Sequence, residues 1–418
     1  MADRELTENR GSVAASALAS QRRDASPQAP ARWYLKVGIV WLLSRVVTTA
    51  LILLFASWQQ QNPWTGARPD YFSFAQLWDS TWYHIVAVAG YPSELPQTAD
   101  GHVGESAWAF MPGYPMLVRL LMVVTGLPWE PISVVVSFAF SLGTALVFYR
   151  LMRERLSGST ALFSVVLFCV APLSPILQVS YAEPMYLFLL TLALLLLVQR
   201  RYSLLFPVVA VMALTRPSGL AFALAMGLHV VYRWWVRRRE PFPLVERLLA
   251  IGVTVFSLLM GFAWLFIAWA VTGSPSAYTD TELAWRMPYI GYVDLVPFTA
   301  WVQGAGFWSA QWGIGALGYV LLALLVVGFF ASLFLPAVKR LGVDLRLWLL
   351  SYGLYLLAVF FPQSSTFRLL MPMSPLLGAV AGPRSPIYRV SIVLLFIAGQ
   401  FGWLYLCWWS NGYDWTPP

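Results

Sequence analysis

The segment 77–92, with the sequence LWDSTWYHIVAVAGYP, combines an acidic residue with aromatic residues at helical spacing. Trp78, Trp82 and Ile85 share one stripe of a helix, so we expect an amphipathic helix that lies flat in a membrane interface with its indoles buried. Asp79 falls on the adjacent flank, where its carboxylate could meet a substrate held in the membrane. A structural interpretation is equally good: Asp79 stands near the helix start and complements the N-terminal dipole.

Two glutamates accompany related motifs. Glu105 precedes AFMPGYP at 109–115, and Glu183 lies within SYAEPMY at 180–186, where another helix is expected to begin. Either carboxylate could serve as a second acid or base. Because glutamate is common in a first helical turn, a structural role is favoured for Glu183.

Two arginines are candidates for binding an anion. The apolar run 203–215 gives a helix of about 20 Å, shorter than a hydrocarbon core of about 30 Å, so Arg216 should be recessed below the surface. Arg368, in PQSSTFRLLMP, is expected at the same face. A guanidinium donates two parallel hydrogen bonds to phosphate and keeps its charge. The alternative for each arginine is an ion pair with Glu183 or Glu105.

Other patterns carry less chemistry. GIGALG at 313–318 follows no strand, so close helix packing explains it better than nucleotide binding. Asp280 and Glu282 could bind a cation, although two exposed acids alone seldom hold one. The three histidines are too scattered for a metal site. We therefore expect no metal and no cofactor.

The composition indicates a multi-pass membrane protein. Apolar residues make up 59% of the chain and charged residues 11%, whereas soluble domains carry about 25% charged residues. The net charge of +8 comes from short basic clusters between apolar runs, which are typical of topology signals, so no nucleic-acid partner is expected. Cys169 and Cys407 lie in apolar segments and predict no disulfide framework.

The apolar pattern predicts an all-α protein. Residues 1–31 read as a disordered cytoplasmic tail and 32–418 as a single transmembrane domain. Arg45, a few turns into the first helix, is expected to extend along the helix toward the cytoplasmic surface. About eleven spans are predicted near 36–57, 131–149, 159–177, 184–199, 203–215, 218–235, 248–271, 313–335, 345–361, 368–382 and 388–408.

The segment 109–126 decides the topology. If it does not cross the membrane, the basic ends of the spans fall on one side, as the positive-inside rule requires. We therefore interpret it as an interfacial or re-entrant helix, with the amino terminus in the cytoplasm and the carboxyl terminus outside. The long loops 58–130 and 272–312 then face outward and hold the candidate site.

In order and spacing, the motifs WDSTWYHIVAVAGYP, AFMPGYP, SYAEPMY, LTRPSGL and FRLLMP resemble those of the PIG-V type mannosyltransferases and their bacterial relatives. These enzymes, which include the one adding the second mannose in GPI-anchor synthesis, belong to the GT-C superfamily of polytopic glycosyltransferases. The resemblance covers about residues 77–375, and its first two motifs are the most specific.

The resemblance implies inverting transfer of a sugar, mannose foremost, from a polyprenyl-phosphate donor to a hydroxyl acceptor at the outer membrane face. Asp79 takes the place of the catalytic acid or base, Glu105 is a second catalytic candidate, and Arg216 and Arg368 hold the donor phosphate. The acceptor does not carry over, and membrane lipids are the remaining expected partner. Weaker substrate-contact candidates are Trp82, Tyr83, His84, Tyr114 and Glu183.

Two rival functions stay open from the sequence. A transporter or flippase of lipid-linked sugars would carry polar residues along the middle of several helices, whereas here the ionisable groups gather near one face. A non-catalytic partner subunit could keep the same fold.

Overall fold

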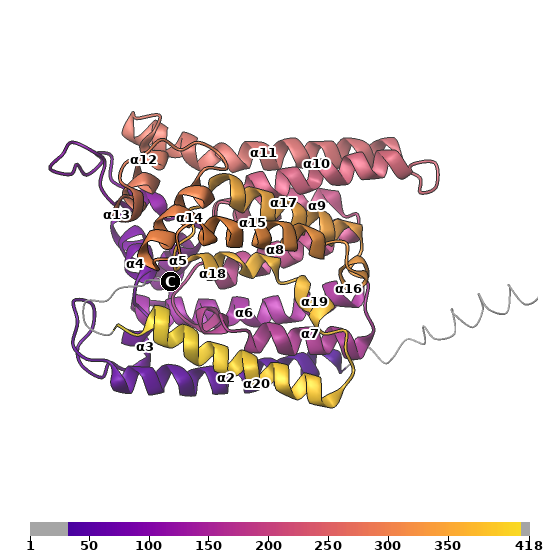
Figure 1. The fold of residues 1–418 in the computed structure, drawn as a ribbon, viewed down its shortest axis with the longest axis horizontal. Helices are drawn as coiled ribbons and strands as arrows, with labels where there is room; N and C mark the ends of the chain where they lie inside the picture. The colour runs from indigo at the N-terminus through magenta and orange to yellow at the C-terminus, as the bar shows by residue number, and fades with distance from the viewer. Residues whose placement is uncertain (1–31, 411–418) are drawn as a thin grey trace, which may run out of the picture.

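The computed structural model describes residues 32–410, so the predicted tail 1–31 lies outside the described residues. Within that range the regular elements are helices, arranged as a bundle whose long members run side by side (Figure 1). The bounds of the longer helices are α2 Trp33–Trp58, α4 Asp79–Ala89, α5 Gly113–Thr125, α6 Trp129–Arg153, α7 Gly158–Val170, α8 Glu183–Val198, α9 Tyr202–Ala213, α10 Gly219–Val236, α11 Leu244–Thr272, α12 Ala277–Ala284, α14 Ala300–Gln311, α15 Leu317–Ser332, α17 Val343–Val359 and α20 Pro386–Trp403. The shorter ones are α3 Tyr71–Phe74, α13 Met287–Ile290, α16 Pro336–Lys339, α18 Thr366–Leu369 and α19 Leu376–Val380, with single turns η1 Ala107–Ala109, η2 Ser174–Gln178, η3 Met371–Met373 and η4 Leu404–Trp408.

Five of these helices are long and apolar enough to cross a membrane: α2, α6, α10, α11, and α20 with its continuation to Trp408. Shorter apolar helices, among them α7, α8, α9 and α15, lie beside them. In the most apolar windows of α11 and α20 only 22% of the residues are buried inside the protein. These outward apolar faces are those of a multi-pass membrane protein.

Helix α8 forms the centre of the core. Nearly all its side chains are buried, and it packs against α6, α9 and α17. A helix that is apolar on every side is expected in the interior. Its first residue is Glu183, so the central helix carries one of the predicted site residues at its end.

The predicted span 368–382 is not one helix. The chain forms α18, η3 and α19 instead, with Pro372 inside η3 and Pro375 directly before α19. Proline lacks the backbone donor and disfavours helical backbone in the residue before it, which explains the breaks. The prediction of a single continuous helix here was wrong.

Arg45 is 2% exposed and does not extend toward a membrane surface, so that expectation was also wrong. Its Nη2 donates to the Cys169 carbonyl at 2.6 Å and its Nη1 to the Ser174 carbonyl at 2.9 Å. Helix α7 ends at Val170, shortly before Pro172, and leaves terminal carbonyls without helical partners. The buried arginine of α2 satisfies one of these carbonyls and one in η2.

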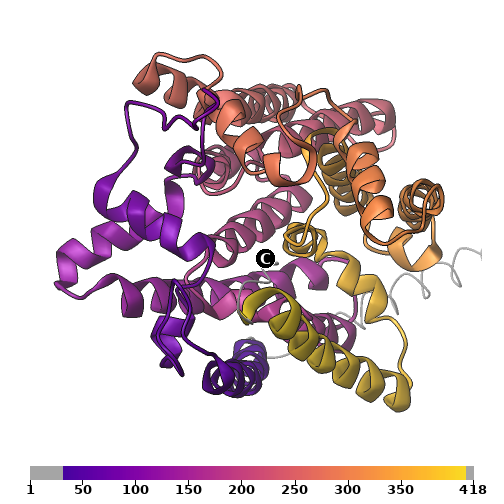
Figure 2. The ribbon, with the colours of Figure 1, turned by 60° about the vertical axis from the view of Figure 1, so that its left-hand side comes forward.

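The two ends of the bundle differ in character. The links α6–α7 and α10–α11, which carry basic clusters, both lie at the right-hand end of Figure 1, and the helices α3, α4, α12 and α13 lie at the other end. Figure 2 brings this second end forward and shows the segments before α6, the orange segments after α11 and the yellow C-terminal segments around a common centre. The loops 58–130 and 272–312 thus contain several short helices and lie at one end. We call it the site end.

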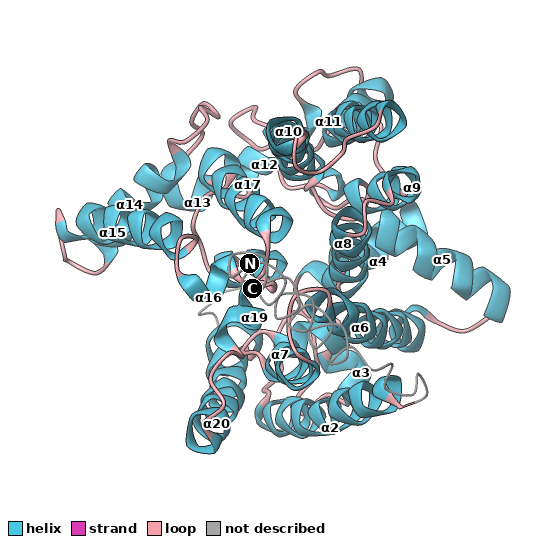
Figure 3. Ribbon diagram, turned by 90° about the vertical axis from the view of Figure 1, so that its right-hand side faces the viewer, coloured by secondary structure: helices cyan, strands magenta, loops and turns pink. Residues whose placement is uncertain are grey.

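Helix α5 lies across the bundle. Figure 3 looks roughly along α8, α10 and α17 and shows α5 from the side. Its 13 residues, Gly113–Thr125, span about 20 Å, and the helix follows Pro112. This arrangement is the one expected of an interfacial helix rather than of a crossing one.

The expected aromatic stripe of the segment 77–92 does not form. Helix α4 begins only at Asp79, because Trp78 has a positive φ of 62° and lies outside the helix. The Trp78 indole points into the protein, where its Nε1 donates to the Trp408 carbonyl at 3.2 Å. The exposed apolar residues of α4 are Ile85, Val88 and Ala89.

Candidate functional site

Four charged side chains from distant parts of the chain meet at the site end. Asp79 comes from α4, Glu183 from α8, Arg216 from the link between α9 and α10, and Arg368 from α18. We call these four residues the charged cluster. All four side chains are largely buried, with exposed fractions from 4% to 16%. The sequence had singled out each of them separately, and the structure brings them together.

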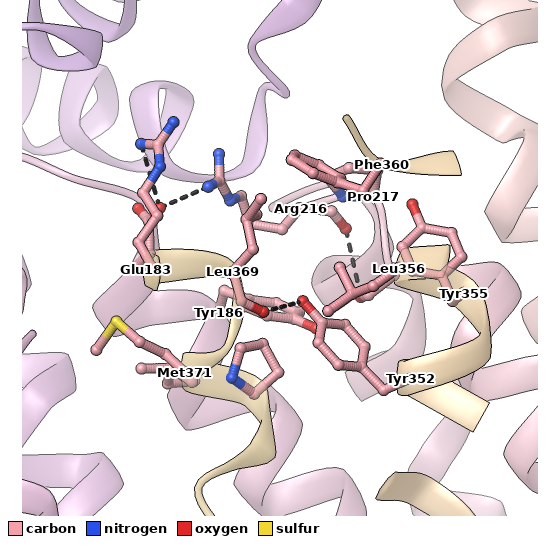
Figure 4. A pocket seen from close by; sticks show the side chains of 14 residues that line it. Glu183, Tyr186, Arg216, Pro217, Tyr352, Tyr355, Leu356, Phe360, Leu369 and Met371 are labelled. Carbon is pink, nitrogen blue, oxygen red and sulfur yellow. Dashed lines mark hydrogen bonds and ion pairs between the residues drawn. The ribbon is translucent and has the colours of Figure 1, made fainter. Parts of the chain in front are cut away.

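Glu183 links the two arginines (Figure 4). Its Oε1 accepts from Arg216 Nη2 at 2.5 Å and lies 3.4 Å from Arg368 Nη1. Arg368 Nη1 also pairs with Asp79 Oδ2. The predicted alternative for the arginines, an ion pair with Glu183, is therefore what the structure contains. Two carboxylates and two guanidinium groups leave the cluster with no net charge.

Local backbone geometry positions both acids. Asp79 and Glu183 are the first residues of α4 and α8, so each also complements a helix dipole, as the structural interpretation predicted. The Asp79 amide donates to the Tyr181 hydroxyl at 3.2 Å. Pro184 directly follows Glu183, in the first turn of α8. The backbone N–H groups of a first turn have no helical partner, so proline costs no hydrogen bond there and favours a helix start at this position.

Tyrosines form one wall of the cluster. The Tyr83 hydroxyl accepts from Arg216 Nη1 at 3.3 Å, and the Tyr83 ring meets the edges or faces of Tyr114 and Tyr181 at centroid distances of 5.4 and 6.3 Å. Tyr114 in turn donates to the Ser133 carbonyl at 2.9 Å. Burial raises the pKa values of Tyr83 and Tyr181 well above the usual range for a phenol. These phenols therefore stay neutral and can donate hydrogen bonds.

A small cavity of about 30 Å³ adjoins the cluster. Arg216, Arg368 and Glu183 line it together with Tyr352 and Tyr355 of α17. A cavity of this size holds one or two water molecules, so a sugar requires a rearrangement of the side chains. Within residues 32–410, Glu183 Oε2 and Arg368 Nε are buried and have no hydrogen-bond partner. Buried polar atoms are normally paired, and these two are available to a ligand or water.

A second cavity, of about 450 Å³, lies next to the first and is lined almost entirely by apolar side chains. Leu356 and Met371 line both cavities, so the apolar space continues from the arginines into the helical bundle. Its walls include Phe168 of α7, Phe329 of α15 and Leu357 of α17.

The remaining predicted residues lie apart from the cluster. Glu105 is exposed, and within residues 32–410 it makes no hydrogen bond or ion pair. The Trp82 ring stacks on Phe110 at 5.6 Å, and the His84 ring on Trp129 at 5.1 Å. Partial burial lowers the pKa of His84. These rings pack α4 against its neighbours.

The sequence did not point to Tyr352 and Tyr355. They stand three residues apart near the site end of α17, in the run SYGLYLL, so they share a helix face. Two tyrosine hydroxyls on one face of the mostly apolar second half of α17 are the signal that could have identified them. Among the described residues, no group of three or more histidine, cysteine, aspartate or glutamate side chains could hold a metal ion.

Comparisons with known proteins give a distant likeness. No family model matches the sequence, and a search of curated proteins gives no match either. Among solved structures, the chain is similar to the Archaeoglobus fulgidus oligosaccharyltransferase in complex with zinc and sulfate, with 14% identity and a TM-score of 0.45 over 91% of this chain and 54% of that one. A second structure of that protein, tethered with an acceptor peptide, gives 12% identity and a TM-score of 0.37 over 91% and 55% of the two chains.

The chain therefore spans about half the length of the structures it matches. A likeness with these TM-scores and identities indicates no activity. What this protein does is inferred from the residues of its own charged cluster.

Proposed function

We propose that the protein is a membrane glycosyltransferase of the PIG-V type. It moves a sugar, mannose foremost, from a polyprenyl-phosphate donor to the hydroxyl of an acceptor whose identity is open. One observation carries this proposal: Asp79 and two arginines, from three separate motifs, meet in one buried cluster beside a cavity. A general base beside two phosphate-binding groups is what such a transfer needs.

The donor phosphate binds Arg216 and Arg368 in this proposal. In the described part of the chain, the buried Nε of Arg368 has no partner, and Arg368 binds Asp79 through Nη1. Because a phosphate offers several charged oxygens in reach of a guanidinium fork, it competes with the Asp79 carboxylate for Arg368. Donor binding thus frees Asp79 for chemistry.

The transfer step uses the freed carboxylate as a general base. The acceptor oxygen attacks the anomeric carbon while its proton passes to Asp79, and the bond between that carbon and the phosphate oxygen breaks on the opposite face. The leaving lipid phosphate takes the bonding electrons, and Arg216 and Arg368 stabilise its charge. General-base help of this kind contributes on the order of 10² to 10⁴ in rate.

The apolar cavity supports a lipid-linked donor. It continues from the arginines through Leu356 and Met371, and its lining offers hydrocarbon rather than hydrogen-bonding groups. When its phosphate is bound by the arginines, an isoprenoid chain can enter this space, where apolar side chains replace the apolar contacts that it makes with membrane lipid.

The segregation of basic links supports an outward-facing site. The clusters in the α6–α7 and α10–α11 links lie at the end opposite the charged cluster. By the positive-inside rule we assign that end to the cytoplasm, and the proposal therefore assigns Asp79 to the outer face. The proposed topology keeps about eleven crossings, with α18 and α19 forming one broken crossing.

Sugar transfer from radiolabelled polyprenyl-phosphate mannose tests the proposal, in membranes that contain equal amounts of wild type or variant. We expect transfer by the wild type and a loss of about 10² to 10⁴ in Asp79→Asn. Asp100→Asn, which changes an exposed aspartate of the same loop, is the control and should keep wild-type activity.

Two results would overturn the proposal. If the wild type transfers sugar from no polyprenyl-phosphate donor, the transporter and partner-subunit functions become preferable. If folded Asp79→Asn keeps full activity, Asp79 is not the base.

A further inference from the structure

The side-chain amide of Gln76 joins three segments that surround the charged cluster. Gln76 lies in the turn between α3 and α4, shortly before Asp79. Its Oε1 accepts from Ser80 Oγ of α4 and from Trp129 Nε1 of α6, both at 2.7 Å. Its Nε2 donates to Ser180 Oγ, at 2.7 Å, in the link that leads into α8. One amide thus connects the starts of α4 and α6 with the segment before α8.

Further hydrogen bonds join the same segments. The Ser180 amide donates to the Ala75 carbonyl at 3.2 Å, and the Asp79 amide donates to the Tyr181 hydroxyl, also at 3.2 Å. The Ser180 hydroxyl is hydrogen-bonded to Ser133 of α6, with 2.7 Å between the two oxygens. The turn before α4 and the link before α8 are therefore fixed to each other and to α6.

The backbone directly before Asp79 is strained. Trp78 has a φ of 62° and a ψ of −125°, a region that glycine adopts readily and other residues rarely do. Such a conformation costs free energy and persists only where the surrounding structure holds it in place. The hydrogen bond between Gln76 and Ser80 spans this residue. It therefore opposes relaxation of the turn that presents Asp79.

The proposed reaction requires such an anchor. Without a donor, the Asp79 carboxylate is held by Arg368 Nη1. When the donor phosphate takes Arg368, this ion pair is lost, and the position of the carboxylate then depends on the backbone that carries it. A general base must lie within hydrogen-bond reach of the proton that it accepts. The Gln76 amide, which binds this backbone segment to α6 and to the link before α8, remains in place after the exchange.

We infer that Gln76 is a positioning residue, which keeps the Asp79 carboxylate in place for sugar transfer. This inference rests on the proposed function, because Gln76 acts through the general base. Oε1 and Nε2 of Gln76 are both bonded to protein groups, and Gln76 lines neither of the two cavities. Its role is therefore to hold Asp79 and not to bind the donor.

Gln76→Met tests this role, because methionine has a similar length and makes none of these hydrogen bonds. We expect kcat per folded molecule to fall by about 10 to 100-fold, since a small misplacement of a catalytic group can cost about 10²-fold. KM for the donor should stay within about 2-fold, because Arg216 and Arg368 are unchanged. Ser80→Ala removes a single oxygen atom and cuts only the bond to α4, so it should lower kcat by about 3 to 10-fold.

The same substitution in an Asp79→Asn background separates positioning from a general effect on the fold. Asp79→Asn has no base left to position, so Gln76→Met should lower its residual kcat by less than about 2-fold. A general loss of structure would instead lower kcat by the same factor in both backgrounds.

Gln400→Met is the matched control. The Gln400 amide joins α20 to two other helices, since Oε1 accepts from Thr48 Oγ1 of α2 at 2.8 Å and Nε2 donates to the Val170 carbonyl of α7 at 2.9 Å. This substitution removes the same kind of interhelical hydrogen bonds away from the charged cluster. It should keep kcat per folded molecule within about 2-fold of the wild type.

Three results would overturn the inference while leaving the proposed function intact. They are an unchanged kcat in folded Gln76→Met and Ser80→Ala, a raised donor KM in place of a lowered kcat, and an equal loss in the wild-type and Asp79→Asn backgrounds. Absence of transfer by the wild type, or full activity of folded Asp79→Asn, would instead overturn the proposed function or its base, and the inference with it.

Discussion

Buried arginines occur at both ends of the bundle, but their acidic partners differ in exposure. At the basic end, Arg233 is 1% exposed, while its partners Glu240 and Glu246 are 47% and 33% exposed. At the site end, the acids paired with Arg216 and Arg368 are buried along with the arginines. The group around Arg233 is therefore an ion-pair network at the protein surface, whereas the charged cluster is an ion-pair network removed from water.

The two groups also differ in how the chain assembles them. Arg233 pairs with residues 7 and 13 positions further on, across the turn between α10 and α11. Arg368 and Asp79 are 289 positions apart. Removing charges from water costs free energy that the ion pair repays only in part. Glu183 Oε2 lies beside a cavity and is unpaired among the described residues, so the desolvated cluster fits a binding site better than a structural clamp.

The largest difference between the two groups of ion pairs should appear in the stability of variants that lose one acid. Glu183→Gln leaves Arg216 without its nearest charged partner, so we expect the free energy of unfolding to fall by about 3 to 5 kcal/mol. Glu240→Gln removes a charge that is partly solvated and should cost less than about 1 kcal/mol. Thermal melting of the purified variants in one detergent measures both, and equal losses would remove the distinction between the two ends.

Arginine-to-lysine substitutions should affect sugar transfer at the site end and not at the basic end. Arg216→Lys and Arg368→Lys keep the positive charge but lose the guanidinium fork, so we expect transfer to fall by about 10². Arg233→Lys, at the basic end, should change transfer by less than about 3-fold per folded molecule. Sugar transfer normalised to the folded fraction gives the comparison, and wild-type rates in both site variants would refute phosphate binding by the fork.

A third prediction concerns a buried contact far from the site. His229 of α10 lies between the Tyr202 hydroxyl, at 2.9 Å, and Asp344 Oδ1, at 2.7 Å. Asp344→Asn weakens a hydrogen bond to a charged group, so we expect a loss of about 1.5 kcal/mol in stability. Transfer should stay within about 2-fold, and a loss of activity at unchanged stability would show that this contact serves the site.

The smallest effect is expected at an exposed carboxylate that caps a short helix. Asp70 caps α3 by accepting from the Ser73 amide at 2.7 Å, and this hydrogen bonding lowers the pKa of Asp70 below its usual 3.8. Because the folded pKa is depressed, the stabilisation is present above pH 3.8 and is lost as the pH falls below it. Asp70→Ala should therefore cost about 0.5 kcal/mol at neutral pH and nothing in acid. Melting curves at both pH values test this, and a pH-independent difference would contradict it.

The sequence by itself determined the membrane class and the identity of the four clustered residues. Hydropathy is a property of contiguous residues, so α2, α6, α10 and α11 follow directly from transfer free energies. Glu183 and Arg216 could be chosen because charges are rare in apolar segments and each stands beside a proline motif.

Only the tertiary structure decided which charged side chains meet in the cluster and which candidate side chains lie outside it. Arg368 reaches Asp79 across 289 positions, Glu105 stays in water, and Trp78 turns inward because of one positive φ. Each outcome depends on how segments that are distant in the chain pack together. Burial and the geometry of the partners set the free energy of each charged contact, and no local sequence pattern specifies which distant segments meet.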